Sequence, residues 1–84
     1  MPQLAVDLGP IRDILAQHGR LSQDVRLLEP DGSLHNAGLT SLATVSVMLA
    51  LEDQFNVEFP ESMLSRKTFE SLESIAEAVA KLAR

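Results

Sequence analysis

Few residues of this sequence could do chemistry by themselves. Ser41 is a possible nucleophile, with His35 or His18 as its base. An acid such as Asp31 would have to orient that base. The sequence lacks a Gly-x-Ser-x-Gly elbow, and 84 residues are too few to enclose both a triad and a substrate pocket. We therefore interpret both histidines as surface or loop residues and expect that the chain is not an enzyme.

Metal and thiol sites have no support in the residue types present. The chain has no cysteine, which excludes disulfides, thiolate nucleophiles and zinc–thiolate centres. His18 and His35 do not have metal-ligand spacing with neighbouring carboxylates. Any thiol chemistry must therefore be supplied by another molecule.

The charge of the chain also limits its partners. The formal net charge is −5, and no basic stretch is interleaved with aromatic residues, so neither nucleic acid nor an anionic membrane is expected to bind. No window reaches membrane-spanning length, and the N-terminus lacks the charged and apolar regions of a signal peptide. We expect a monomer that works in the cytoplasm.

The composition predicts a single domain, residues 1–84, with an aliphatic helical core. Hydrophobic residues make up 45% of the sequence, but the aromatic ones are three phenylalanines. Leu, Ile, Val and Ala must therefore fill the core, and a chain of this length has one modest core only. The predicted fold class is all-α.

Hydrophobic spacing predicts three main helices and one short one in an antiparallel bundle. The first runs from Gly9-Pro10 to Gly19, although a start near Leu4 with a kink at Pro10 is an alternative. The second runs from about Ser41 to Phe55, with Thr40 or Ser41 as its cap. A short helix begins near Pro60. The last helix covers about Ser71–Ala83, with one apolar face made of Leu72, Ile75, Val79 and Leu82.

The stretch between Gly19 and Thr40 contains two strong turn signals and is long for a loop in a small domain. We expect it to be an ordered connector, held to the core by apolar side chains. The candidates are Val25, Leu27, Leu28, Leu34 and Leu39.

The second predicted helix is apolar on two opposite faces. The face assigned to the core contains Thr44, Val47, Met48, Leu51 and Phe55. The opposite face contains Leu42, Val45 and Leu49. A helix in so small a bundle can hardly bury both faces, so the second stripe is expected to be exposed and to meet partners, unless the long loop covers it.

Acidic side chains follow this stripe. Four acids and no Lys or Arg occur between Ser41 and Ser65, beginning with Glu52 and Asp53. Acids beside an exposed apolar stripe are typical of a docking surface for basic partners, although a charge run can also be merely a solvated face.

The same region resembles the acyl carrier protein family. The resemblance is carried by Gly38-Leu39-Thr40-Ser41-Leu42 and by Leu51-Glu52-Asp53-Gln54-Phe55 with Phe59-Pro60 after it. The family pattern is Gly-x-Asp-Ser-Leu at the start of a helix, Leu-Glu-x-x-Phe near its end and an apolar residue before Pro. Thr40 stands where the family usually has Asp. This difference bears on the recognition of the chain by transferases and synthases that bind that Asp.

The resemblance implies that a phosphopantetheinyl transferase moves 4′-phosphopantetheine from coenzyme A to Ser41, and that the thiol of this arm carries cargo as a thioester. A helix N-terminus would stabilise the phosphodiester anion. Without the resemblance, Ser41 could be only a cap. The residues expected to recognise partner enzymes are Thr40, Leu42, Val45, Leu49, Glu52 and Asp53.

The cargo is less constrained than the carrier role. Thr40-Ser41-Leu42 is similar to stand-alone carriers whose partner is an amino acid:carrier protein ligase, which favours a small amino acid. A fatty-acid or polyketide intermediate delivered by an acyl-transferring synthase, or a peptidyl group, is the alternative. Ser46 stands where many fatty-acid carriers have an acid, and Arg66 and Lys67 place positive charge near the third helix.

A long acyl chain would also need a cavity among core residues such as Val47, Leu51, Ile75 and Val79. The alternative from another class is an unmodified helical interaction domain, in which Ser41 would stay free in the cell.

Overall fold

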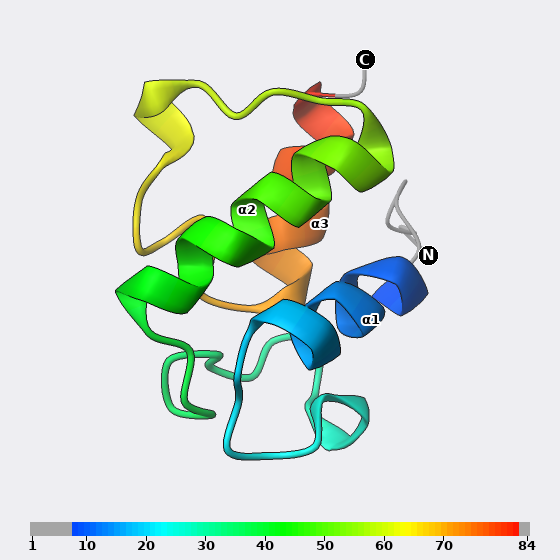
Figure 1. The fold of residues 1–84 in the computed structure, drawn as a ribbon, viewed down its shortest axis with the longest axis vertical. Helices are drawn as coiled ribbons and strands as arrows, with labels where there is room; N and C mark the ends of the chain where they lie inside the picture. Colours follow the sequence, from blue (N-terminus) through cyan, green and yellow to red (C-terminus); the bar gives the residue numbers. More distant parts are fainter. Residues whose placement is uncertain (1–7, 83–84) are drawn as a thin grey trace.

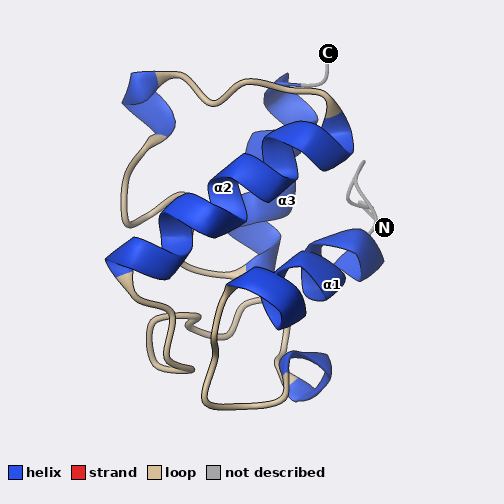
Figure 2. Cartoon of the chain, viewed as in Figure 1, coloured by secondary structure: helices blue, strands red, loops and turns tan. Residues whose placement is uncertain are grey.

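The structure is a computed structural model, which describes residues 8–82 as helices joined by loops (Figures 1 and 2). The α-helices are α1 (Leu8–His18), α2 (Ser41–Phe55) and α3 (Leu72–Leu82). Two single 3-10 turns, η1 (Val25–Leu27) and η2 (Glu61–Met63), lie in the connections. No strand occurs between residues 8 and 82, so the all-α prediction is confirmed. The alternative helix start near Leu4 lies outside the described residues.

The short helix expected near Pro60 is the single turn η2, whereas η1 had not been predicted. The antiparallel arrangement holds for α1 and α2, but α3 runs in the same general direction as α2 (Figure 1). Because residues 56–71 separate these two helices, the chain has enough length to return before α3 begins.

The three helices share one core, because α1 packs against both α2 and α3. Ile11, Ile14 and Leu15 are buried on α1, as the spacing predicted. The largest fully buried side chains of the described range are Phe69, Ile11, Leu15, Leu34, Leu51, Leu72, Ile75, Val47 and Val79.

The buried face of α2 differs slightly from the prediction. Val47 and Leu51 are fully buried, but Ala43 is buried where Thr44 had been expected, and Thr44 is half-buried. Met48 and Phe55 pack at the edge of the core. The opposite stripe is exposed as predicted, with exposed fractions of 83% for Leu42, 50% for Val45 and 55% for Leu49.

Apolar contacts and hydrogen bonds together hold the long loop. Val25, Leu34 and Leu39 are buried, and Leu28 packs against the core. The prediction that Leu27 anchors the loop is wrong, because its side chain is 81% exposed. Leu27 is the last residue of η1. A single turn can bury only one of its sides, and in η1 the buried side is the one that carries Val25.

Arg12 of α1 is an anchor that the apolar pattern did not reveal. Its Nη1 donates hydrogen bonds to the carbonyl oxygens of Val25 at 2.7 Å and Leu28 at 2.9 Å. The Leu34 N–H donates to the Glu70 carbonyl at 2.8 Å. The loop is thereby tied both to α1 and to the segment that precedes α3.

The start of η1 is stabilised by a local ion pair on the surface. The Asp24 carboxylate accepts hydrogen bonds from the backbone and side chain of Arg26. The side-chain hydrogen bond from Arg26 holds the pKa of Asp24 below its usual value. Both groups are solvent-exposed, so this pair shapes the loop locally and contributes little to stability.

None of the helices described between residues 8 and 82 combines the length and the apolar character needed to cross a bilayer.

Candidate functional site: the start of helix α2

Thr40 is the cap of α2. Its backbone is extended, with φ −98° and ψ 166°, and its Oγ1 accepts a hydrogen bond from the Ala43 N–H at 3.1 Å. Its carbonyl accepts hydrogen bonds from the N–H of Thr44 at 2.9 Å and from the Thr44 hydroxyl at 2.7 Å. Of the two caps that the sequence allowed, the structure therefore selects Thr40.

Ser41 is the first residue of α2 and is exposed. Its hydroxyl makes no hydrogen bond to any described residue, because Thr40 has taken the capping role. The backbone N–H groups of Ser41 and Leu42 also have no acceptor among the described residues. An accessible hydroxyl next to two free donors at a helix N-terminus fits a phosphodiester attached to Ser41.

Gly38 places the chain so that α2 begins at this point. Its φ is +110°, and a Cβ at this position would lie 2.9 Å from the backbone nitrogen of Ser22. The N–H and the hydroxyl of Ser22 both donate to the Ala37 carbonyl, at 2.8 and 2.9 Å. Glycine is required because the backbone is left-handed and two segments meet closely.

Ser41 opens onto a groove of about 320 Å³. Thr44, Val45 and Met48 of α2 form one wall. The other wall is the segment before α3, which contributes Leu64, Ser65, Arg66 and Phe69, and His35 of the long loop completes the lining. The volume lies at the lower end of the range of about 300–1,000 Å³ for small-molecule sites.

Two contacts hold the second wall of this groove. His35 Nε2 donates a hydrogen bond to the Arg66 carbonyl at 3.3 Å. Phe69 is buried and packs on Phe59 with 5.6 Å between ring centroids. The Phe59 N–H in turn donates to Glu52 Oε2 at 2.9 Å, so the end of α2 is linked to the wall opposite Ser41.

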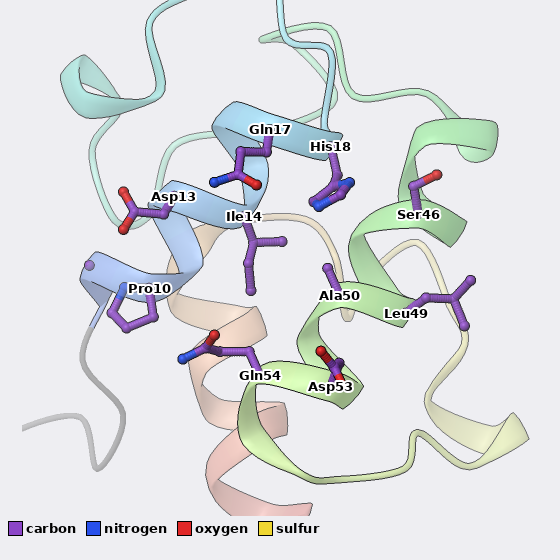
Figure 3. Close-up of a pocket in the computed structure, with 11 residues that line it drawn as sticks. Pro10, Asp13, Ile14, Gln17, His18, Ser46, Leu49, Ala50, Asp53 and Gln54 are labelled. Carbon is purple, nitrogen blue, oxygen red and sulfur yellow. The ribbon is translucent and has the colours of Figure 1, made fainter.

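A larger groove of about 880 Å³ lies between α1 and α2 and does not include Ser41 (Figure 3). In Figure 3, Ile14 and His18 of α1 lie across the groove from Ala50 of α2. Leu49 and Asp53 line the same groove. The helix α2 therefore separates two grooves, and only the smaller one is next to the candidate attachment residue.

The structure divides the residues predicted to recognise partners into different environments. Val45 lines the groove at Ser41, while Leu49 and Asp53 line the groove between α1 and α2. Leu42 lines neither and points into solvent. Glu52 is half-buried and holds Phe59, so its carboxylate has a structural task that its position in an acidic run did not indicate.

Sequence reasoning missed the position of Arg66 beside Ser41. Arg66 was expected near the third helix, and it lies in the segment before α3. This segment folds back onto the first half of α2, so Arg66 also lines the groove beside Ser41. Arg66 is far from Ser41 in the sequence and lies in an irregular segment, where hydrophobic periodicity carries no signal. His35 had been interpreted as a surface or loop residue, and it does lie in the long loop, but its place beside Ser41 had not been predicted.

The groups needed for hydrolysis or for metal binding do not come together within residues 8–82. His35 and Ser41 share a groove, but no carboxylate lines it, whereas His18 belongs to the other groove. The same residues contain no cluster of three or more His, Cys, Asp or Glu that could hold a metal ion.

Comparison with known proteins shows the family to which this chain belongs. The model of the family described as "Phosphopantetheine attachment site" matches residues 11–79. The aminoacyl carrier protein of Agrobacterium fabrum is 42% identical over 69 residues, which cover 82% of this chain and 83% of that protein. Aminoacyl carrier protein 1 of Bradyrhizobium diazoefficiens is 33% identical over 82% of this chain and 72% of its own length.

Solved structures agree with the sequence relatives. The carrier protein from Agrobacterium tumefaciens, crystallised with an engineered Bradyrhizobium japonicum glycine:carrier protein ligase and ATP, matches with a TM-score of 0.84 and 39% identity. That match covers 88% of this chain and 96% of the solved chain. A structure of the Bradyrhizobium japonicum ligase with glycylated carrier protein matches with a TM-score of 0.61 and 30% identity, over 82% and 96% of the chains. This chain therefore belongs to the phosphopantetheine-attachment family of carrier proteins.

Proposed function

We propose that this carrier holds 4′-phosphopantetheine on Ser41 and carries a small amino acid, loaded by an ATP-dependent amino acid:carrier protein ligase. The observation that carries this assignment is the exposed Ser41 hydroxyl, which makes no hydrogen bond at the start of α2 while Thr40 acts as the cap. The identity to aminoacyl carrier proteins supports the cargo. When bound, the prosthetic group supplies the thiol on which the thioester forms.

The residues at the start of α2 accept the prosthetic group, keep it accessible to enzymes and stabilise its phosphodiester. Ser41 Oγ is the acceptor for the phosphopantetheinyl group, and its position on an exposed helix start lets a phosphopantetheinyl transferase reach it. The free N–H groups of Ser41 and Leu42 stabilise the phosphodiester charge through the helix dipole. Thr40 takes the capping position without adding a negative charge beside that anion.

The closed core supports a small cargo. Val47, Leu51, Ile75 and Val79 have no exposed surface, so a long acyl chain could enter between them only if the helices separated. An aminoacyl group is short and carries an ammonium ion, whose unpaired burial would be costly. Such a cargo stays in solvent and requires no opening of the bundle.

The exposed stripe of α2 supports docking of the ligase and the transferase. Leu42, Val45 and Leu49 expose half or more of their side chains, and α2 contains Glu52 and Asp53 but no Lys or Arg. A partner with apolar and basic side chains would complement this helix. Because Leu49 and Asp53 line the groove with α1, the docking surface extends from the helix start toward α1.

We further propose that the chain works as a monomer in the cytoplasm and has no catalytic activity of its own. The lack of a carboxylate in the groove at Ser41 supports the absence of catalysis. The net charge of −5 supports the monomer, because like charges oppose self-association. Activity would then reside in the partner enzymes.

Loading of the holo-protein tests the proposed cargo. The holo-protein is incubated with ATP, an amino acid:carrier protein ligase and either glycine or alanine. In a parallel reaction it is incubated with ATP, a long-chain fatty acid and a ligase for that acid. The intact mass is recorded in each case. We expect addition of one small aminoacyl group, released by hydroxylamine as a thioester requires, and none on Ser41→Ala. Loading by long acyl groups in preference to amino acids would contradict the proposal.

A further inference from the structure

The groove beside Ser41 is positively charged, although the protein as a whole is acidic. Arg66 is the permanently charged side chain in its lining, and no carboxylate lines it. The salt bridge found among the described residues joins Arg26 to Asp24 on another part of the surface, so the guanidinium of Arg66 has no acidic partner there.

We propose that Arg66 is a phosphate-binding residue of the holo-protein. Its guanidinium pairs with the phosphodiester of the group on Ser41 and holds the first part of the arm in the groove. This inference rests on the proposed attachment to Ser41. It goes beyond that proposal, because it assigns the arm a binding site in the groove and names Arg66 as the residue that holds its phosphate there. Guanidinium groups favour phosphate oxygens through charge-assisted hydrogen bonds.

Two elements would supply donors to a phosphate on Ser41. The N–H groups of Ser41 and Leu42 come from the helix start, and Arg66 comes from the opposite wall of the groove. Between Ser41 and Ser65 the chain has four acids and no Lys or Arg, so Arg66 is the first cation after the attachment residue. Without it, an anionic group on Ser41 would lose its side-chain counterion in the groove.

The backbone at Arg66 is held while its side chain is left free. His35 Nε2 donates to the Arg66 carbonyl, and the Ser65 hydroxyl lies 3.2 Å from that of Thr68 and accepts from the Thr68 N–H at 3.4 Å. Phe69 is buried just beyond this turn. The Arg66 side chain is exposed, so its guanidinium can adjust to a phosphate while its backbone stays in place.

Apolar residues continue the groove beyond the charged end. Val45, Met48, Leu64 and Phe69 line it, and Val45 and Leu64 are half-exposed. The uncharged pantetheine part of the arm can lie against these side chains, while the phosphate stays near Arg66. The arm is therefore expected to spend part of its time in the groove rather than moving freely.

Lys67 offers a matched control, since it is the adjacent cation, is exposed, and does not line the groove. Arg66→Gln and Lys67→Gln lower the net charge equally. Each variant is prepared in apo and holo form, with intact mass confirming the arm. Phosphorus NMR of the phosphodiester and amide shifts at Val45, Leu64 and Phe69 are compared between the two forms.

In Arg66→Gln we expect a narrower phosphorus line and apo-to-holo amide shifts reduced about two-fold or more, because an exposed charge pair changes a population by a factor of up to about five. Arg66→Glu should reduce the shifts further, and Lys67→Gln should retain them. Raising the salt concentration should weaken the wild-type effect toward that of Arg66→Gln.

Unchanged phosphorus and amide spectra in a holo Arg66→Gln protein would overturn the role of Arg66 and leave the attachment to Ser41 intact. An equal loss in Lys67→Gln would also overturn it, since general charge would then suffice. If the wild-type mass shows no arm at all, the proposed function fails, and the inference about Arg66 fails with it.

Discussion

Thr40 Oγ1 accepts a hydrogen bond from the Ala43 backbone N–H at 3.1 Å. This contact satisfies a donor at the start of α2 that Ser41 would otherwise have to satisfy. Two neighbouring hydroxyl residues are thereby separated in function: Thr40 stabilises the helix, and Ser41 is available to an enzyme.

The different contacts of Thr40 and Ser41 predict stability losses of different size for their alanine variants. Thr40→Ala should lower the free energy of unfolding by about 0.5–2 kcal/mol, because it removes the cap. Ser41→Ala should change it by less than about 0.5 kcal/mol, since an exposed side chain without a partner is lost. Chemical denaturation of both apo variants checks this. A larger loss for Ser41→Ala than for Thr40→Ala would mean that Ser41 is the true cap.

The exposed stripe of α2 predicts a difference between function and stability. Leu42→Ala and Leu49→Ala should change the free energy of unfolding by less than about 0.5 kcal/mol. They should lower the efficiency of loading by about five-fold or more if they are central to an interface. Leu51→Ala should instead cost about 2–5 kcal/mol, because Leu51 is fully buried. Equal stability losses at the three positions would show that the stripe is covered in solution.

Two adjacent acids at the end of α2 should behave differently. Glu52→Gln weakens the hydrogen bond to the Phe59 N–H and should lower the free energy of unfolding by about 1–2 kcal/mol. This loss is small for a hydrogen bond to a charged group, because Glu52 is only half-buried. Asp53→Asn removes an exposed charge that caps nothing in the described structure and should be nearly neutral. Thermal melting of the pair compares them directly. Equal melting temperatures would refute the structural role of Glu52.

A side chain at Gly38 should lower the stability of the protein. Gly38→Ala puts a Cβ 2.9 Å from the Ser22 nitrogen in a left-handed backbone, which should cost about 1–2 kcal/mol or more. Gly32→Ala is the control, since its Cβ would meet the Glu29 carbonyl oxygen at 3.2 Å without a left-handed φ, and it should cost less. Urea unfolding measures both, and a Gly38→Ala protein as stable as wild type would contradict the described turn.

The fold was largely predictable because the helices have clear periodic faces. The bounds of α2 agree with the prediction at both ends, since a cap precedes it and Asn56 ends it in a left-handed conformation. The contributions of Arg12 and Leu27 were not predictable. Arg12 acts through hydrogen bonds to distant carbonyls, and the exposure of Leu27 depends on how one turn of loop sits on α1.

The position of Ser41 at the start of α2 was predictable, but the surroundings of this candidate site were not. A local motif makes Ser41 the candidate attachment residue, and its position at a helix start follows from neighbouring residues. The groove depends on a fold-back that brings Arg66 and His35 to Ser41, and no local pattern records such a contact. The half-buried position of Glu52 likewise depends on where Phe59 returns to the helix.

The core predicts how the carrier responds to its cargo. Aminoacylation of the holo-protein should leave the amide resonances of Val47, Leu51, Ile75 and Val79 almost unchanged, because these residues are fully buried and a short charged cargo stays outside. A long-chain acyl form provides the comparison in the same NMR experiment. Large shifts at these four positions on aminoacylation would contradict the closed-core description.

Intact-mass analysis after coexpression with a phosphopantetheinyl transferase tests the central claim most directly. Ser46→Ala is the matched control, since Ser46 is an exposed serine on the same helix. The wild-type and Ser46→Ala proteins should each gain the mass of one phosphopantetheinyl group, and Ser41→Ala should gain none. A modified Ser41→Ala protein, or a wild-type protein that stays unmodified with an active transferase, would contradict the account.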